Sequence, residues 1–158
     1  MKVLVIYDSV FGNTEKIAQA IANALRPKVG VQLLQAGNLT PAHLLGSDLL
    51  IVGSPTRGFR PTEAVAALLK GISAKALSGL RVAAFDTRLE ADQMKSAAAR
   101  FVINTGGYAA KRIADSLKKA GGTLVLPPEG FFVDDTEGPL KPGELERAAE
   151  WAATLIPA

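Results

Sequence analysis

The chain contains 158 residues, of which 48% are hydrophobic and 21% are charged. This length fits one domain with a sizeable core, and the apolar fraction excludes a disordered chain. Cysteine is absent, which excludes disulfides, iron–sulfur clusters and thiol nucleophiles. Because His43 is the single histidine, a multi-histidine metal site is excluded as well, and any redox chemistry needs an organic cofactor.

The net charge of +3 is unevenly distributed along the chain. Residues 129–158 carry seven acidic and two basic side chains, a net charge of −5, so residues 1–128 carry +8. The basic residues are scattered and aromatic residues make up only 6%, so nucleic-acid binding is not expected. The apolar runs are too short for a membrane span or a signal peptide, and we expect a cytoplasmic protein without a membrane span.

Short apolar runs rich in branched residues predict strands that are buried on both faces. These runs lie at residues 3–7, 49–52, 82–85 and 123–126, and a weaker run at 31–34 suits an edge strand. Helical spacing of apolar residues appears between the runs. It predicts helices at residues 13–26, from 60–62 to Gly71, from Ala109 to Gly121, and at 142–155 with Leu145, Ala148, Ala152 and Leu155 inward.

Strands that alternate with helices predict a parallel sheet of right-handed βαβ units in one domain spanning residues 1–158. Five strands in this length favour a doubly wound five-stranded sheet with strand order 2-1-3-4-5, covered by helices in a three-layer α/β/α arrangement. In such a sheet the ligand binds beyond the carboxyl ends of the first and third strands. The chemistry is therefore expected in the loops after Tyr7, Val52 and Phe85.

The first of these loops leaves a buried strand and opens a helix. It holds the short polar side chains of Ser9, Asn13 and Thr14, and Gly12 allows the backbone to approach a ligand closely. A helix N-terminus presents free N–H groups and the positive end of a dipole, so the loop suits a phosphate group, although an ordinary cap and turn would have the same composition. It matches neither the dinucleotide fingerprint nor a P-loop.

The other two loops are irregular and polar. Two glycines and two prolines in residues 53–61 predict a fixed, irregular backbone that carries Thr56, Arg57 and Phe59. The connection after Phe85 begins with Asp86-Thr87-Arg88 and runs to Tyr108, with a short helix expected at residues 91–100. A link of this length is often functional.

The three loops, taken in order, resemble those of the flavodoxin family, and the resemblance extends over essentially the whole chain. Ser9, Gly12 and Thr14 fill the diagnostic positions of the family's phosphate-binding pattern, and residues 137–147 resemble the terminal stretch of stand-alone prokaryotic members. The resemblance implies the flavodoxin-like fold and FMN as the cofactor.

By this resemblance, the first loop would hold the FMN phosphate and the other two loops would line the flavin. The implied cofactor-binding residues are Ser9, Phe11, Gly12, Asn13, Thr14, Ser54, Pro55, Thr56, Arg57, Gly58, Phe59, Asp86, Thr87 and Arg88. Phe59 and, more weakly, Tyr108 are the candidates to stack on the ring. The chain departs from many family members in being basic, and in having Asp86-Thr87-Arg88 where an aromatic residue often follows the strand.

The favoured function is an FMN-dependent electron carrier, in which the positive charge of residues 1–128 suggests an acidic redox partner protein. Two alternatives stay open. One is an FMN-dependent oxidoreductase, of the quinone reductase or protoporphyrinogen oxidase kind, with residues 88–108 forming a substrate pocket. The other is a flavin-free member of the fold with a binding or regulatory role. No side-chain pair demands acid–base catalysis, so the sequence names no catalytic residue.

Overall fold

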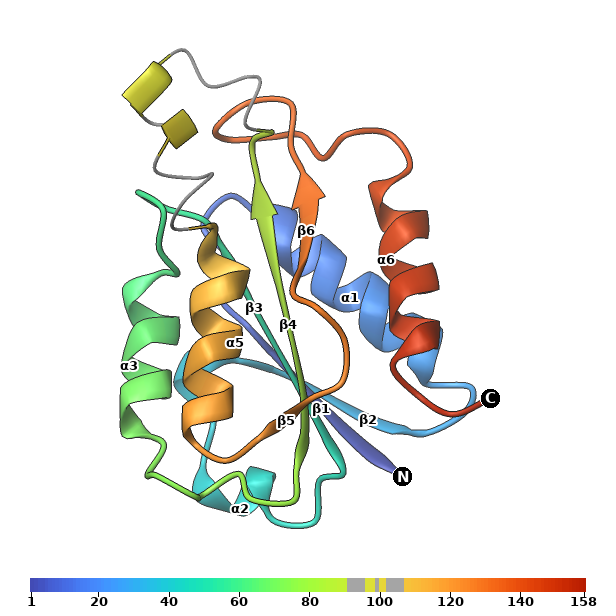
Figure 1. Cartoon of the computed structure of the whole chain (residues 1–158). Coiled ribbons are helices and arrows are strands. Elements are labelled where there is room, and N and C mark those ends of the chain that lie inside the picture. Colours follow the sequence, from blue (N-terminus) through green and yellow to red (C-terminus); the bar gives the residue numbers. More distant parts are fainter. Residues whose placement is uncertain (91–95, 99, 102–106) are drawn as a thin grey trace.

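The computed structural model describes residues 1–90, 96–98, 100–101 and 107–158, and its centre is a parallel β-sheet (Figure 1). The strands are β1 (Lys2–Tyr7), β2 (Gly30–Gln35), β3 (Leu49–Pro55), β4 (Arg81–Arg88), β5 (Thr123–Leu124) and β6 (Glu129–Phe132). Their order is β2-β1-β3-β4-β5, with β6 also paired to β4. The predicted parallel sheet and its order are confirmed.

Helices cover both faces of the sheet and give the three expected layers (Figure 1). Helices α1 (Asn13–Leu25) and α6 (Glu144–Thr154) pack on one face, and α3 (Glu63–Gly71) and α5 (Ala109–Lys119) pack on the other. A 3-10 turn η1 (Ala36–Asn38) and a short helix α2 (Pro41–Leu44) follow β2. Among the described residues, no helix is long and apolar enough to span a membrane.

The fifth strand differs from its prediction as one continuous run at residues 123–126. It consists of two pieces, β5 and β6. Their pairing with β4 is interrupted where residues 125–128 lie beside only Ala83 and Ala84. Pro127 and Pro128 lie in this interruption, and proline has no backbone N–H to donate to a neighbouring strand. The second piece, β6, was not predicted from the sequence.

The carboxyl end of β4 is also longer than predicted. Thr87 pairs with Phe131 and Arg88 pairs with Phe132, so Asp86-Thr87-Arg88 lies in a strand rather than in a loop. The expected helix at 91–100 falls mostly on residues outside the described ranges, although residues 97–98 and 100–101 are helical.

The apolar core lies in two halves, one on each side of the sheet. On the side of α1 and α6, Phe85, Phe131 and Trp151 form an edge-to-face cluster with centroid separations of 6.0–6.2 Å. Ala148, Ala152 and Leu155 are buried there as predicted, but Leu145 is 43% exposed, so its predicted inward position was wrong. Glu144 is buried instead, because its carboxylate accepts hydrogen bonds from Arg147 and from the backbone of Phe132.

Candidate functional site

A cavity of about 680 Å³ opens at the carboxyl ends of β1, β3 and β4, where the sequence predicts the ligand site. Its volume lies within the usual range for small-molecule and cofactor sites. Most of the predicted site residues line it: Ser9, Phe11, Asn13, Thr14, Pro55, Thr56, Arg57, Gly58, Phe59, Thr87 and Arg88. The fold therefore brings the three sequence segments together around one space.

The loop between β1 and α1 presents backbone N–H groups to this cavity. Gly12 caps α1 with φ at +93°, a conformation that favours glycine, and a Cβ at this position would meet no atom within 4 Å. The Ser9 hydroxyl accepts hydrogen bonds from the N–H groups of Gly12 and Glu15 at 3.1 and 3.3 Å. Among the described residues, the N–H groups of Phe11, Asn13 and Thr14 have no hydrogen-bond acceptor. An anion at this helix N-terminus would satisfy them.

Two side chains of the same loop are held by distant parts of the chain. The Thr14 hydroxyl is buried and lies 2.7 Å from the Thr87 hydroxyl on β4. The Asn13 amide donates to the Glu137 carbonyl at 3.1 Å, and this contact ties the segment after β6 to the start of α1. The polar floor of the cavity is therefore positioned before any ligand binds.

The loop after β3 forms the second wall and contains a tight turn. Arg57 and Arg60 exchange backbone hydrogen bonds at 2.8 and 3.0 Å, and the two residues between them, Gly58 and Phe59, both have positive φ. The Arg57 guanidinium lies 5.3 Å from the centre of the Phe11 ring, so the turn closes over the first loop. Phe59, the predicted stacking residue, is half-buried and lines the cavity.

Thr56 fixes the base of this wall. Its N–H donates to the Thr87 carbonyl at 2.9 Å, and its hydroxyl accepts the Ala109 N–H at the start of α5 at 3.0 Å. Ser54 does not line the cavity. It is fully buried, donates to the Pro55 carbonyl and accepts the Thr62 N–H at the start of α3, so it supports the loop from behind.

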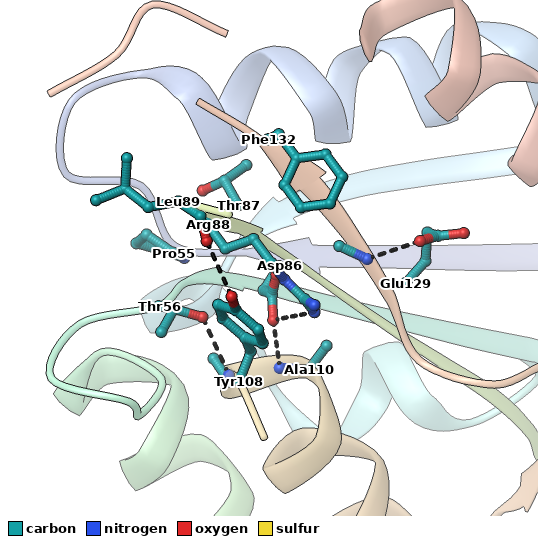
Figure 2. Close-up of polar contacts among 12 residues, drawn as sticks. Pro55, Thr56, Asp86, Thr87, Arg88, Leu89, Tyr108, Ala110, Glu129 and Phe132 are labelled. Carbon is teal, nitrogen blue, oxygen red and sulfur yellow. Dashed lines mark hydrogen bonds and ion pairs between the residues drawn. The ribbon is translucent and has the colours of Figure 1, made fainter. Parts of the chain in front are cut away.

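The third wall is built on a buried ion pair at the end of β4 (Figure 2). The Asp86 carboxylate is inaccessible to solvent and accepts two hydrogen bonds from Arg88, at 2.6 and 2.8 Å. It also accepts the Ala110 N–H of α5 at 2.9 Å. Burial raises the pKa of Asp86 above its ordinary value, and these hydrogen bonds oppose that shift. Asp86 is buried and does not line the cavity, whereas Arg88 does.

Tyr108 completes this wall and was the weaker candidate for stacking. The Arg88 guanidinium lies 3.8 Å from the centre of its ring, and the Tyr108 hydroxyl donates to the Leu89 carbonyl at 3.0 Å (Figure 2). Both Arg88 and Tyr108 line the cavity. One face of the ring is thus covered by a cation that is itself neutralised by Asp86.

A further wall comes from the segment after β6, which the sequence analysis did not place at the site: Val133, Asp135 and Thr136 line the cavity. The missed strand explains this, because β6 extends the sheet beside β4 and delivers Val133 to the cavity, where its N–H donates to the Arg88 carbonyl at 2.9 Å. Leu89 and Ser96 also line the cavity, from the connection after β4 that the oxidoreductase alternative assigns to a pocket.

The residues present fit a planar cofactor that carries a phosphate. The three N–H groups of the first loop that find no acceptor among the described residues would receive the anion, and Phe11, Pro55, Phe59 and Tyr108 supply apolar and aromatic surface for a ring. Within the described part of the chain, no group of His, Asp or Glu side chains is arranged to hold a metal ion.

Comparison with known proteins gives one consistent relationship. The family model of flavodoxin matches residues 5–151. A flavodoxin of Aquifex aeolicus is 46% identical over 57 residues, which are 35% of this chain and 31% of that protein, so the match spans about a third of the relative's length.

Solved structures agree over nearly the full chain. The oxidised Flavodoxin 1 of Bacillus cereus is similar with a TM-score of 0.76 and 18% identity, over 98% of this chain and 97% of the other. A flavodoxin from the domain Archaea has a TM-score of 0.74 and 22% identity, over 98% and 96%. At these identities the two structures show the fold alone.

Proposed function

The chain belongs to the flavodoxin family, and from this membership we propose that it binds FMN in the cavity described above and carries electrons between redox partners. Flavodoxins bind FMN and transfer electrons to partner proteins, so the family agrees with the cofactor predicted from the sequence. When bound, FMN supplies one- and two-electron chemistry that the side chains of this chain lack.

One observation carries the proposal. The backbone N–H groups of Phe11, Asn13 and Thr14 lack acceptors among the described residues and lie at the N-terminus of α1, beside a cavity at the switch point of the sheet. Such a cradle binds phosphate through N–H donors and the helix dipole. In this proposal the first loop holds the phosphate, while the loop after β3 and the end of β4 hold the ring.

The side chains would also set the electrical environment of the cofactor. Reduction adds negative charge inside the cavity, and the cation of Arg57, which forms no ion pair with the residues that the structure describes, would favour it. Arg88 contributes less, because Asp86 neutralises its charge at 2.6 Å. The chain's positive charge outside residues 129–158 supports an acidic redox partner.

The test is the visible absorption of the purified protein after it is loaded with FMN and desalted. We expect flavin bands to stay with the protein and a single redox cycle per flavin, without steady turnover of NAD(P)H and quinone. Steady turnover in the absence of a separate reductase would favour the oxidoreductase alternative. A colourless protein that cannot retain FMN would overturn the proposal.

A pair of variants tests whether the Thr14 hydroxyl adds a hydrogen bond to the phosphate beside the N–H cradle. Thr14→Val keeps the size of a buried side chain and removes its hydroxyl, whereas Thr123→Val makes the same change on an exposed residue of β5. We expect Thr14→Val to weaken FMN binding about tenfold, as expected for the loss of one charge-assisted hydrogen bond. Binding of riboflavin, which lacks the phosphate, should change little in either variant. Equal losses for FMN and riboflavin would place Thr14 away from the phosphate.

A further inference from the structure

A second and larger cavity lies between α3 and α5 and is lined in part by the loop after β3. Its volume is about 980 Å³, and we call it the α3–α5 groove. The two helices run side by side on one face of the sheet (Figure 1). Val10 and Arg57 line both cavities, so the groove begins where the proposed flavin site ends.

The groove carries an excess of uncompensated positive charge. Its lining includes one acid, Glu63, and five cations: Arg57, Arg60, Lys70, Arg112 and Lys119. None of these cations forms an ion pair within the described ranges of the chain. By contrast, two other cations of α5, Lys111 and Lys118, pair with Asp115 at 2.8 and 3.6 Å. The positive charge of α5 is therefore left unneutralised on the side that faces the groove.

The floor of the groove is aliphatic. Leu69 and Ile72, together with three alanines, supply the apolar surface, and Val10 is 48% exposed at the end nearest the cofactor cavity. No aromatic side chain appears among the lining residues that the structure describes. A nucleotide base would find nothing to stack on, whereas aliphatic side chains of another protein would find a matching surface.

The cations are spread along the groove rather than gathered at one point. Arg112 and Lys119 lie near opposite ends of α5, and a rise of 1.5 Å per residue separates them by about 10 Å along the helix. Arg60 and Lys70 likewise lie before and near the end of α3. A single phosphate would contact one end of this array, whereas an extended segment with several carboxylates would contact all of it.

We propose that the α3–α5 groove docks an acidic segment of the redox partner, with an aliphatic stripe against the floor and carboxylates against the flanking cations. This inference rests on the proposed electron-transfer function, which supplies the reason for a partner to bind beside the cofactor cavity. Docking here would cover Val10 and Arg57, and so bring the partner to the edge of the cofactor site. Charge complementarity of this kind speeds association and selects the partner.

The test uses a synthetic fluorescent helical peptide of about 15 residues, long enough to span the groove at 1.5 Å per residue. In this acidic peptide, glutamates lie on both sides of a leucine–alanine stripe. The control, a lysine peptide, has lysines in place of the glutamates. Fluorescence anisotropy measures binding to the full chain, with and without added FMN, at about 20 mM and about 200 mM salt. Inorganic tripolyphosphate is titrated in parallel as a small polyanion.

The decisive variants carry equal changes in net charge. Lys70→Glu/Lys119→Glu reverses two groove cations, and Lys111→Glu/Lys118→Glu reverses the two cations of α5 that pair with Asp115. We expect the groove variant to weaken binding of the acidic peptide at least tenfold, about 1.4 kcal/mol, and the control by less than about twofold. Lys70→Gln/Lys119→Gln should fall between the wild type and the groove variant. Higher salt should weaken binding, and the lysine peptide should not bind.

Three results would overturn the inference: no binding of the acidic peptide at low salt, equal weakening by both charge-reversal variants, or tighter binding of tripolyphosphate than of the peptide. The last result would make the groove a small-anion site. The flavin absorption of the same samples keeps the two proposals separate. Peptide binding by a protein that retains no FMN would leave the docking groove and refute the electron carrier. A protein that retains FMN but does not bind the peptide would leave the electron carrier and refute the docking groove.

Discussion

Substitution of Asp86 tests whether this residue supports the walls of the cofactor cavity or contacts the cofactor itself. The resemblance to flavodoxins implies a flavin contact, but the carboxylate is fully buried and Asp86 does not line the cavity. From residues that the structure describes, the carboxylate accepts two hydrogen bonds from Arg88 and one from the Ala110 N–H. We therefore expect Asp86→Ala to destabilise the fold with and without FMN by nearly the same amount.

The magnitude follows from what the substitution leaves behind. Removing one partner of a buried ion pair costs about 3–5 kcal/mol. The Arg88 side chain is 17% exposed and can recover some water, which places Asp86→Ala near the lower end, at about 3 kcal/mol. Asp86→Asn keeps an acceptor for the Ala110 N–H and should cost less, about 1–2 kcal/mol. For a domain of this size, about 3 kcal/mol corresponds to a fall in Tm of roughly 6–12 °C.

Urea unfolding of the FMN-free and FMN-loaded protein measures both quantities. Arg88→Ala and the double variant Asp86→Ala/Arg88→Ala complete a cycle, in which we expect the double variant to lose less than the sum of the single losses. The reasoning would be refuted if Asp86→Ala cost under about 1 kcal/mol without FMN. It would also be refuted if the substitution weakened FMN binding more than about tenfold, since that loss would show a contact with the cofactor itself.

Three further changes test other parts of the structure. Arg57→Glu should lower the reduction potential of the FMN-loaded protein by a few tens of millivolts, because each unit of charge near a surface contributes about 0.5–1 kcal/mol. The control Arg26→Glu, at the far end of α1, should leave the potential unchanged. Equal potentials for the wild type and Arg57→Glu would show that Arg57 does not favour reduction. Hydrogen bonds outweigh burial and lower the pKa of Glu144, so its contribution to stability is present above the ordinary glutamate pKa and is lost as pH falls through the lowered one. Glu144→Gln should therefore cost about 1–2 kcal/mol in urea unfolding at neutral pH and progressively less as the pH falls below the ordinary glutamate pKa; a constant loss would contradict this. Gly53→Ala would place a Cβ 2.0 Å from the Phe85 ring and should destabilise the fold by about 2–3 kcal/mol, which thermal unfolding would measure.

The sequence predicts those parts of the fold that repeat a simple pattern. Continuous apolar runs identify β1, β3 and β4 because both faces of a central strand are covered by helices. The pattern fails where a strand is short and interrupted, as in β5 and β6, since two prolines and a glutamate hide the second piece. It also failed at Leu145, because the buried stripe of α6 includes Glu144, whose carboxylate is held by Arg147 one turn along the helix and by the Phe132 N–H of β6.

The missed strand has a direct consequence for the candidate site. Without β6 the end of β4 pairs on one side only, where β3 reaches as far as Thr87, and so the polar stretch Asp86-Thr87-Arg88 looks like a loop. With β6 in place the stretch is extended, and its side chains alternate between the two faces of the sheet. Thr87 contacts Thr14 on the α1 side, whereas Asp86 contacts Ala110 on the α5 side. The sequence analysis treated these three adjacent residues as one surface that contacts the flavin, but their side chains lie on different faces of the sheet.

This alternation explains how one strand end can serve both sides of a cavity. Thr87 joins the polar floor beside the first loop, and Arg88 returns to the α5 side to cover the Tyr108 ring. Asp86 lies on the same side as Arg88 but one step deeper, where it can neutralise that guanidinium and hold the N-terminus of α5. Because the charge of Arg88 is neutralised within the strand end, Arg57 is the cavity cation without an ion pair in the described part of the chain. Arg57 also lines the α3–α5 groove, so a partner that docks there would alter the charge environment of the proposed cofactor site through this one side chain.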